Sequence, residues 1–227
     1  DKKLVIFGTG EIAALARFYF QQDSSYEVVA FTADDEFVKE SSFEGLPLFP
    51  YSEAKKKFLP NDHEMHVALS YKKLNQIRRD RYLRCKADGY RMASYICSKS
   101  VYWSDLSHGD NCFILENQTI QPTVKIGNNV MIWSGNHLGH ASVIHDHVYI
   151  SSHVVISGHC SIGACSFLGV NATIRDFITV GENTFIAMDA GVVKDTPPGS
   201  VILGGRSTVF EADTREARTL KEKFFSL

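Results

Sequence analysis

The sequence has no long apolar run, no excess of charge of one sign and no closely spaced cysteine pair, and each absence excludes a class of protein. No stretch approaches the roughly 20 apolar residues that cross a membrane, and no secretory signal opens the chain, so we expect no membrane insertion. The 24 basic and 26 acidic residues leave a formal charge of −2. A charge so close to zero does not favour binding to nucleic acid or to an anionic membrane.

The cysteine content also argues against some classes of protein. There are five of them, an odd number, with no C-x-x-C pair. This usage is typical of a reducing compartment, where a buried cysteine behaves as a small apolar residue. We therefore expect a cytoplasmic protein and favour this interpretation over a redox or zinc–thiolate role.

What the sequence does have is an internal repeat of six residues. Neither a helix, with a period of 3.6, nor an ordinary strand, with a period of 2, produces that spacing. A small or β-branched residue usually stands two places before each repeated aliphatic residue, and glycine follows several of them. The repeated positions are Ile114, Ile120, Ile126, Ile132, Leu138, Ile144, Ile150, Ile156, Ile162, Leu168, Ile174, Val180, Ile186 and Val192. The pattern predicts short strands and tight corners around a narrow apolar prism, whose coils must stack to bury their apolar side chains.

This repeat resembles that of the hexapeptide-repeat family, the left-handed parallel β-helix of bacterial acyltransferases. In that family three hexapeptides make one triangular coil, an exception to right-handed crossover connections. At that count, the unbroken register of the repeat implies between four and five coils and no loop excursion.

The N-terminal segment is predicted to be a separate α/β unit. Strands at 4–7, 27–32 and 67–69 and helices at 11–22 and 73–86 give a short Rossmann-like βαβ arrangement. We expect this domain over residues 1–97, the β-helix over 98–205 and a C-terminal helical cap over 206–227.

A glycine-rich turn follows the first strand. Gly8, Thr9 and Gly10 begin a G-x-G-x-x-A pattern, and Asp34 and Asp35 follow the second strand. Such a backbone can approach a phosphate at a helix N-terminus, although a purely structural turn would use the same glycines. We predict that these five residues bind substrate, in a unit too short to be a full dinucleotide fold.

His140 is the predicted catalytic residue. Six of the nine histidines lie in the coils, and most are expected to be surface residues. The segment 133–140 places polar groups and a glycine around His140. Acyl transfer from a thioester needs a base for the incoming amine or hydroxyl but no covalent nucleophile, and histidine suits that role.

A zinc site is the alternative for the same residue. His140 and His145 stand five residues apart, as in the γ-class carbonic anhydrases, which share the β-helix. A catalytic zinc needs three protein ligands. The third would lie near position 104, where this chain has Ser104 and Asp105. We expect no metal.

Across nearly the whole chain, the order of parts resembles the sugar N- and O-acetyltransferases related to the bacillosamine and sialic acid biosynthesis enzymes. The resembling segments are 5–10, 29–35, 139–144, 162–163 and 167–171. The resemblance implies a homotrimer with acetyl-CoA between subunits, a nucleotide-linked amino sugar in the N-terminal pocket and His140 as the general base. It places contacts to coenzyme A at Gly158, Val170 and Met188, with an oxyanion-stabilising N–H near Gly158.

Two departures from that family affect the site. An acidic residue often follows the catalytic histidine, but here Ala141 does, which leaves Asn136 or His137 to orient His140. The bacillosamine enzyme has a second histidine nine residues later, where this chain has Tyr149, a further predicted substrate-binding residue.

The sequence therefore predicts an acetyl-CoA-dependent N-acetyltransferase that acts on a nucleotide-linked amino sugar for bacterial surface polysaccharide, such as lipopolysaccharide. Two alternatives stay open. One is O-acetylation of a sugar hydroxyl, and the other is a β-helix scaffold without catalysis.

Overall fold

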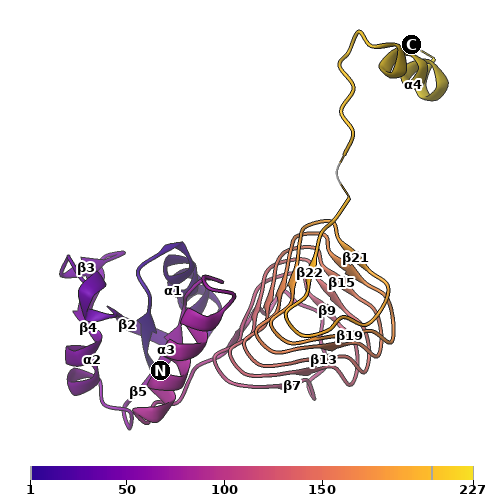
Figure 1. Ribbon diagram of the computed structural model, residues 1–227. Coiled ribbons are helices and arrows are strands. Elements are labelled where there is room, and N and C mark those ends of the chain that lie inside the picture. The colour runs from indigo at the N-terminus through magenta and orange to yellow at the C-terminus, as the bar shows by residue number, and fades with distance from the viewer. Residues whose placement is uncertain (1, 206, 227) are drawn as a thin grey trace.

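The structure is a computed structural model that describes residues 2–205 and 207–226 (Figure 1). An α/β domain comes first, a triangular β-helix follows it, and a short helix ends the chain. The predicted α/β domain plus left-handed parallel β-helix is confirmed.

The N-terminal domain is built around a mostly parallel sheet with the strand order β3-β4-β2-β1-β5, in which only β3 and β4 pair antiparallel. The third predicted strand was placed too late, because β5 ends at Val67. The segment between β2 and β5 contains elements that the sequence did not predict. The elements are β1 (Lys2–Phe7), α1 (Glu11–Asp23), β2 (Tyr26–Ala33), a 3₁₀ turn (Asp35–Phe37), β3 (Ser42–Phe43), β4 (Leu46–Pro50), α2 (Tyr51–Lys57), β5 (His63–Val67) and α3 (Gln76–Ala87).

The β-helix has three faces, each a parallel sheet of two-residue strands (Figure 1). The first face contains β6 (Tyr95–Ile96), β8 (Phe113–Ile114), β11 (Met131–Ile132), β14 (Tyr149–Ile150), β17 (Phe167–Leu168), β20 (Phe185–Ile186) and β22 (Val201–Ile202). The second contains β9 (Thr119–Ile120), β12 (His137–Leu138), β15 (Val155–Ile156), β18 (Thr173–Ile174) and β21 (Gly191–Val192). The third contains β7 (Ser107–His108), β10 (Lys125–Ile126), β13 (Val143–Ile144), β16 (Ser161–Ile162) and β19 (Thr179–Val180). All fourteen repeated aliphatic residues are buried as the second residue of a strand, which confirms the repeat.

The corners are made by residues in the left-handed backbone conformation, one every six residues. Asn111, Asn129, His147, His159 and Phe177 are examples, with φ between 53° and 65°. Asparagine tolerates this region better than most residues, which explains its recurrence at the corners. A tight left-handed residue at each corner turns the chain from one face to the next without a loop.

The N-terminal domain packs on the first face of the β-helix. Phe20 on α1 contacts the rings of Tyr95 and Phe113, which point outward from β6 and β8, and all three are buried in one apolar cluster. β6 lies in the β-helix sheet although it precedes the expected domain boundary at residue 97. The two domains therefore share a core.

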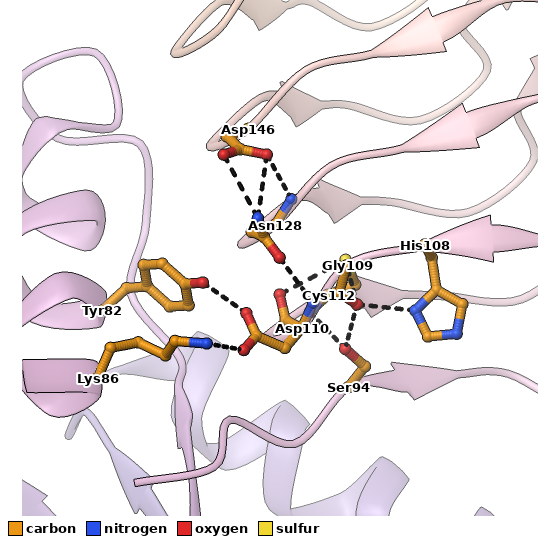
Figure 2. A network of polar contacts seen from close by, with 9 residues as sticks. All are labelled: Tyr82, Lys86, Ser94, His108, Gly109, Asp110, Cys112, Asn128 and Asp146. Carbon is orange, nitrogen blue, oxygen red and sulfur yellow. Dashed lines mark hydrogen bonds and ion pairs between the residues drawn. The ribbon is translucent and has the colours of Figure 1, made fainter. Parts of the chain in front are cut away.

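Polar contacts from α3 fix the same interface at a neighbouring corner (Figure 2). The carboxylate of Asp110 accepts hydrogen bonds from Tyr82 and Lys86 on α3. A ladder then continues up the coils: the backbone N–H of Asp110 donates to Asn128, and that of Asn128 donates to Asp146. These bonds tie α3 to three successive coils.

The C-terminal helix α4 (Arg215–Phe225) forms, but it does not cap the β-helix within this chain. It lies away from the β-helix (Figure 1). Thr214 caps its N-terminus by accepting a hydrogen bond from the N–H of Ala217, and Leu220, Phe224 and Phe225 are exposed. In the described parts of the chain, no helix has both the length and the apolar character needed to cross a membrane.

Candidate active site

A cavity of about 720 Å³ opens at the carboxyl edge of the N-terminal sheet, against the first face of the β-helix. Gly8, Thr9, Gly10 and Asp34 line it, as predicted, and so does Tyr149 from β14. The carboxyl edge is where ligands bind in open α/β sheets. Five of the six predicted substrate-binding residues therefore meet in one cavity.

Asp35 is the exception, because it lies outside this cavity. Its Oδ1 accepts a hydrogen bond from the N–H of Ser52 at 3.1 Å, which lowers the pKa of the Asp35 carboxyl. Because the 3₁₀ turn begins directly after Asp34, the two adjacent carboxylates point in different directions. Asp35 thus stabilises the start of α2.

The two glycines of the turn have different roles. A Cβ on Gly8 would lie 2.5 Å from the carbonyl oxygen of Ala68, and its φ of 142° disfavours other residues. Gly10 has open space around it and caps the N-terminus of α1 without a side-chain hydrogen bond. Gly8 is therefore required by packing, whereas Gly10 leaves the first N–H groups of α1 accessible to an anion.

Asp34 is held by two arginines from α3. Arg81 Nε donates to Asp34 Oδ2 at 2.7 Å, and Arg84 Nη2 donates to Oδ1 at 2.6 Å. Arg81 and Lys72 also line the cavity. Lys72, Arg81 and the α1 N-terminus thus face the cavity, and these groups suit a phosphorylated ligand. Glu11, Asp34 and Glu36 line the cavity as well, and Asp34 is paired with Arg81. The sequence pattern did not point to Arg81 and Lys72, because nothing in their spacing places α3 beside the glycine turn.

The opposite wall of the cavity is aromatic. Tyr149 stacks on Phe167 at a centroid distance of 5.3 Å, Tyr71 packs edge-on against both rings, and Trp133 donates its indole N–H to the Tyr149 hydroxyl. Burial raises the pKa of Tyr149, so its hydroxyl stays protonated at neutral pH. Tyr149 can bind a ring or a hydroxyl, but it cannot replace a histidine as a base.

His140 occupies a different place, the corner between the second and third faces. It is exposed, and its ring lies over Gly158 in the next coil. His159 packs edge-on against it at 5.0 Å and stacks in turn on Phe177. Within the described residues the N–H of Gly158 donates no hydrogen bond.

Gln121 contacts His140, and the two residues expected to do so lie elsewhere. Oε1 of Gln121 lies 3.1 Å from His140 Nδ1 and 2.9 Å from the backbone nitrogen of His140. Asn136 is buried at the other end of β12, where its Oδ1 accepts the N–H of Val154. His137 lies on β12, paired between Thr119 and Val155. The prediction for Asn136 and His137 was wrong because both precede the corner that carries His140.

The three predicted contacts to coenzyme A lie on two edges of the second face. Gly158 adjoins His140, whereas Val170 and Met188 lie at the corner between the first and second faces and are 40% and 61% exposed. In the described part of the chain no three histidine, cysteine, aspartate or glutamate side chains gather as a metal site. His145 instead contacts the hydroxyl of Ser161 through Nε2 at 3.1 Å.

The cavity and His140 lie on opposite sides of the β-helix. The N-terminal domain covers the first face. The strand order places His140 at the corner between the other two faces, between β12 and β13. The cavity and His140 therefore do not meet within one chain.

Similarity to known proteins agrees with this architecture. The family described as bacterial transferase hexapeptide (six repeats) matches residues 123–158. An acyl-[acyl-carrier-protein]–UDP-N-acetylglucosamine O-acyltransferase of Burkholderia lata is 26% identical over 82 residues, which are 36% of this chain and 31% of that protein. The chain spans about a third of the length of such curated relatives.

Solved structures cover nearly the whole chain. The acetyltransferase domain of PglB from Neisseria gonorrhoeae in complex with acetyl coenzyme A is 20% identical, with a TM-score of 0.80 over 92% of this chain and 100% of that one. WeeI from Acinetobacter baumannii is 20% identical, with a TM-score of 0.75 over 92% of this chain and 100% of that one. A mutant perosamine N-acetyltransferase from Caulobacter crescentus, in complex with CoA and GDP-perosamine, is 17% identical, with a TM-score of 0.68. The match covers 89% of this chain and 93% of that one.

The chain thus contains a bacterial transferase hexapeptide repeat. It has the two-domain fold of these acetyltransferase structures, so the predicted fold is confirmed over both domains.

Proposed function

We propose that the protein is an acetyl-CoA-dependent N-acetyltransferase acting on a nucleotide-linked amino sugar. The observation that carries this proposal is the His140 corner, where an oriented imidazole lies over a glycine whose N–H is unpaired within the described residues. The fold shared with a structure in complex with acetyl coenzyme A supports it. So does the fold shared with a structure in complex with CoA and GDP-perosamine.

In the mechanism His140 is the general base. Nδ1 donates its hydrogen to Gln121, so Nε2 holds the lone pair that takes a proton from the attacking amine. Bound acetyl-CoA supplies an acetyl group already activated as a thioester. The N–H of Gly158, whose residue adjoins the ring, is the proposed donor to the carbonyl oxygen as negative charge develops on it. The proton held on His140 then leaves with the thiol, and the acetamide and free coenzyme A are the products.

The amino sugar would bind in the cavity of the N-terminal domain. The α1 N-terminus, Lys72 and Arg81 are suited to the diphosphate, and the rings of Tyr71 and Tyr149 to a flat or hydroxylated part of the ligand. Because this cavity lies on the far side of the β-helix from His140, the active site needs a neighbouring subunit. A homotrimer in which one subunit supplies His140 and the next supplies the cavity satisfies this requirement.

A thiol-release assay tests the proposal directly. Purified protein is mixed with acetyl-CoA and a panel of UDP-, dTDP- and GDP-linked amino sugars, and free coenzyme A is measured. Release with one of them, lost in His140→Ala and kept in His145→Ala, is the expected result. No release across the panel, with acetyl-CoA still bound, would contradict a nucleotide-linked amino sugar as the acceptor.

O-acetylation is the second candidate, and one observation favours it. The curated relatives that match part of this chain are named as O-acyltransferases. The same assay with nucleotide-linked sugars that carry only hydroxyl groups separates the two acceptors. If acetyl-CoA fails to bind at all, the β-helix is a scaffold and both transferase proposals are wrong.

A further inference from the structure

Gln121 makes two hydrogen bonds through a single oxygen atom, and both come from His140. Oε1 lies 2.9 Å from the backbone nitrogen of His140 and 3.1 Å from its Nδ1. Gln121 directly follows β9, one coil below the His140 corner, and its own N–H donates to the carbonyl of Leu138. The amide is therefore anchored by the same coil that it contacts.

This pair of contacts determines the orientation of the Gln121 amide. A backbone N–H can only donate, so the atom facing it must be the amide oxygen and not the amide nitrogen. The same oxygen faces His140 Nδ1, and a neutral amide oxygen can only accept. Nδ1 must therefore carry the hydrogen, and Nε2 must carry the lone pair when the ring is neutral.

The ring has no second partner that would compete for Nε2. Within the described residues no hydrogen bond involves His140 Nε2. A Cβ built on Gly158 would lie 2.9 Å from that atom, so the glycine leaves the space that the ring occupies. The ring of His159 packs edge-on against the His140 ring, at a centroid distance of 5.0 Å.

We propose that Gln121 is the positioning residue of the site, which holds His140 in the tautomer whose Nε2 is free to act as a base. This inference rests on the proposed acetyl transfer and deepens it by naming a residue 19 positions from His140 in sequence. A free imidazole prefers the hydrogen on the other nitrogen by a small margin, so the amide selects the minor tautomer of the free ring. Because the amide is neutral, it orients the ring without the added negative charge that a carboxylate would bring.

Three variants separate this role from a purely structural one. Gln121→Leu removes the acceptor at similar size, Gln121→Glu keeps it and adds charge, and His145→Ala is a control at a histidine outside the site. We expect Gln121→Leu to lower kcat by roughly 10-fold or more, short of the about 10²–10⁴-fold loss expected for His140→Ala, with KM for acetyl-CoA unchanged. Gln121→Glu should restore most of kcat and move the acidic limb of the pH–rate profile up by about one pH unit, since a carboxylate stabilises the protonated ring.

A second readout does not depend on activity. In protein labelled with ¹⁵N-histidine, the ring nitrogens of His140 are identified by their loss in His140→Ala. The expected spectrum shows Nδ1 protonated in the wild type and the two tautomers mixed in Gln121→Leu. An unchanged tautomer, or a pH profile unmoved in Gln121→Glu, would overturn the assignment of Gln121. If the wild-type protein transfers no acetyl group, the proposed function is refuted. The tautomer measurement would still test the role of Gln121.

Discussion

The imidazole of His140 lies directly over the α-carbon of Gly158, one coil further along the β-helix. A Cβ at Gly158 would come within 2.7 Å of His140 Cε1 and 2.9 Å of Nε2. Side chains in contact at such distances must move. The glycine therefore keeps open the space in which the candidate base lies against Gln121.

Gly158→Ala should for this reason remove activity without unfolding the protein. The methyl group would push the exposed His140 ring off Gln121, and we expect kcat to fall by about 100-fold, within the range of a lost general base. Gly191→Ala is the matched control, because a Cβ there meets nothing closer than 3.6 Å. Thiol-release kinetics and a thermal melt of both variants check the prediction. Normal turnover in Gly158→Ala would show that the ring position does not matter.

The two glycines of the N-terminal turn should respond differently to alanine. Gly8 has a positive φ and a backbone oxygen 2.5 Å from its missing Cβ, so Gly8→Ala should destabilise the domain by about 1–3 kcal/mol or more. Gly10 has no atom within 4 Å of a built Cβ, so Gly10→Ala should fold normally. Urea unfolding of the two variants measures the difference. Equal stabilities would mean that the turn is not packed against Ala68 as described.

Two buried histidines at the domain interface predict a loss of stability in acid. Burial lowers the pKa of His66 and of His147 to about 4. The unfolded chain binds protons on these residues below about pH 6.5, whereas the folded chain does so only near pH 4. The stability that they contribute is therefore complete above pH 6.5 and is lost as the pH falls toward 4, by about 3 kcal/mol for each residue.

His147→Asn tests this pH dependence. Asn111 and Asn129 occupy the equivalent corners below His147 with the same left-handed backbone, so asparagine fits the position. The variant should lose about half of the pH dependence of the unfolding free energy between pH 6.5 and 4. The measurement is a set of denaturant titrations across that range. If the unfolding free energy of the variant depends on pH as steeply as that of the wild type, His147 is not a source of the pH dependence.

The β-helix was predictable because its repeat is a direct consequence of geometry. The six-residue spacing counts the residues of one strand and one corner, so the spacing alone assigns the aliphatic residues from Ile114 to Val192 to the interior, where they lie. The same register could have predicted that Asn136 is buried. It stands two places before Leu138, the position that Val124, Val130 and Val148 also fill.

Contacts between coils and between domains were harder to predict. Gln121 stands directly below Gly139 once 18 residues are counted per coil, so its proximity to His140 could have been found from the register. Nothing in the sequence shows that α3 brings Arg81 to Asp34, because that contact depends on how the helix packs on the sheet. The short strands β3 and β4 also lacked a signal, since a two-residue strand and a strand containing Pro47 have no strand pattern.

The central claim is that the His140 corner of one subunit and the cavity of another form one active site. Gly10→Trp should fill the cavity from a position with open space around it, and His140→Ala removes the base. Each variant alone should be inactive. Co-expressed in equal amounts, they should form mixed trimers in which about one site in four combines an intact His140 with an intact cavity.

The measurement is the thiol-release rate of the co-expressed mixture relative to the wild type. Recovery of about a quarter of wild-type activity, from two inactive parents, is the predicted result. A mixture as inactive as its parents would place both halves of the site in a single chain and contradict the account.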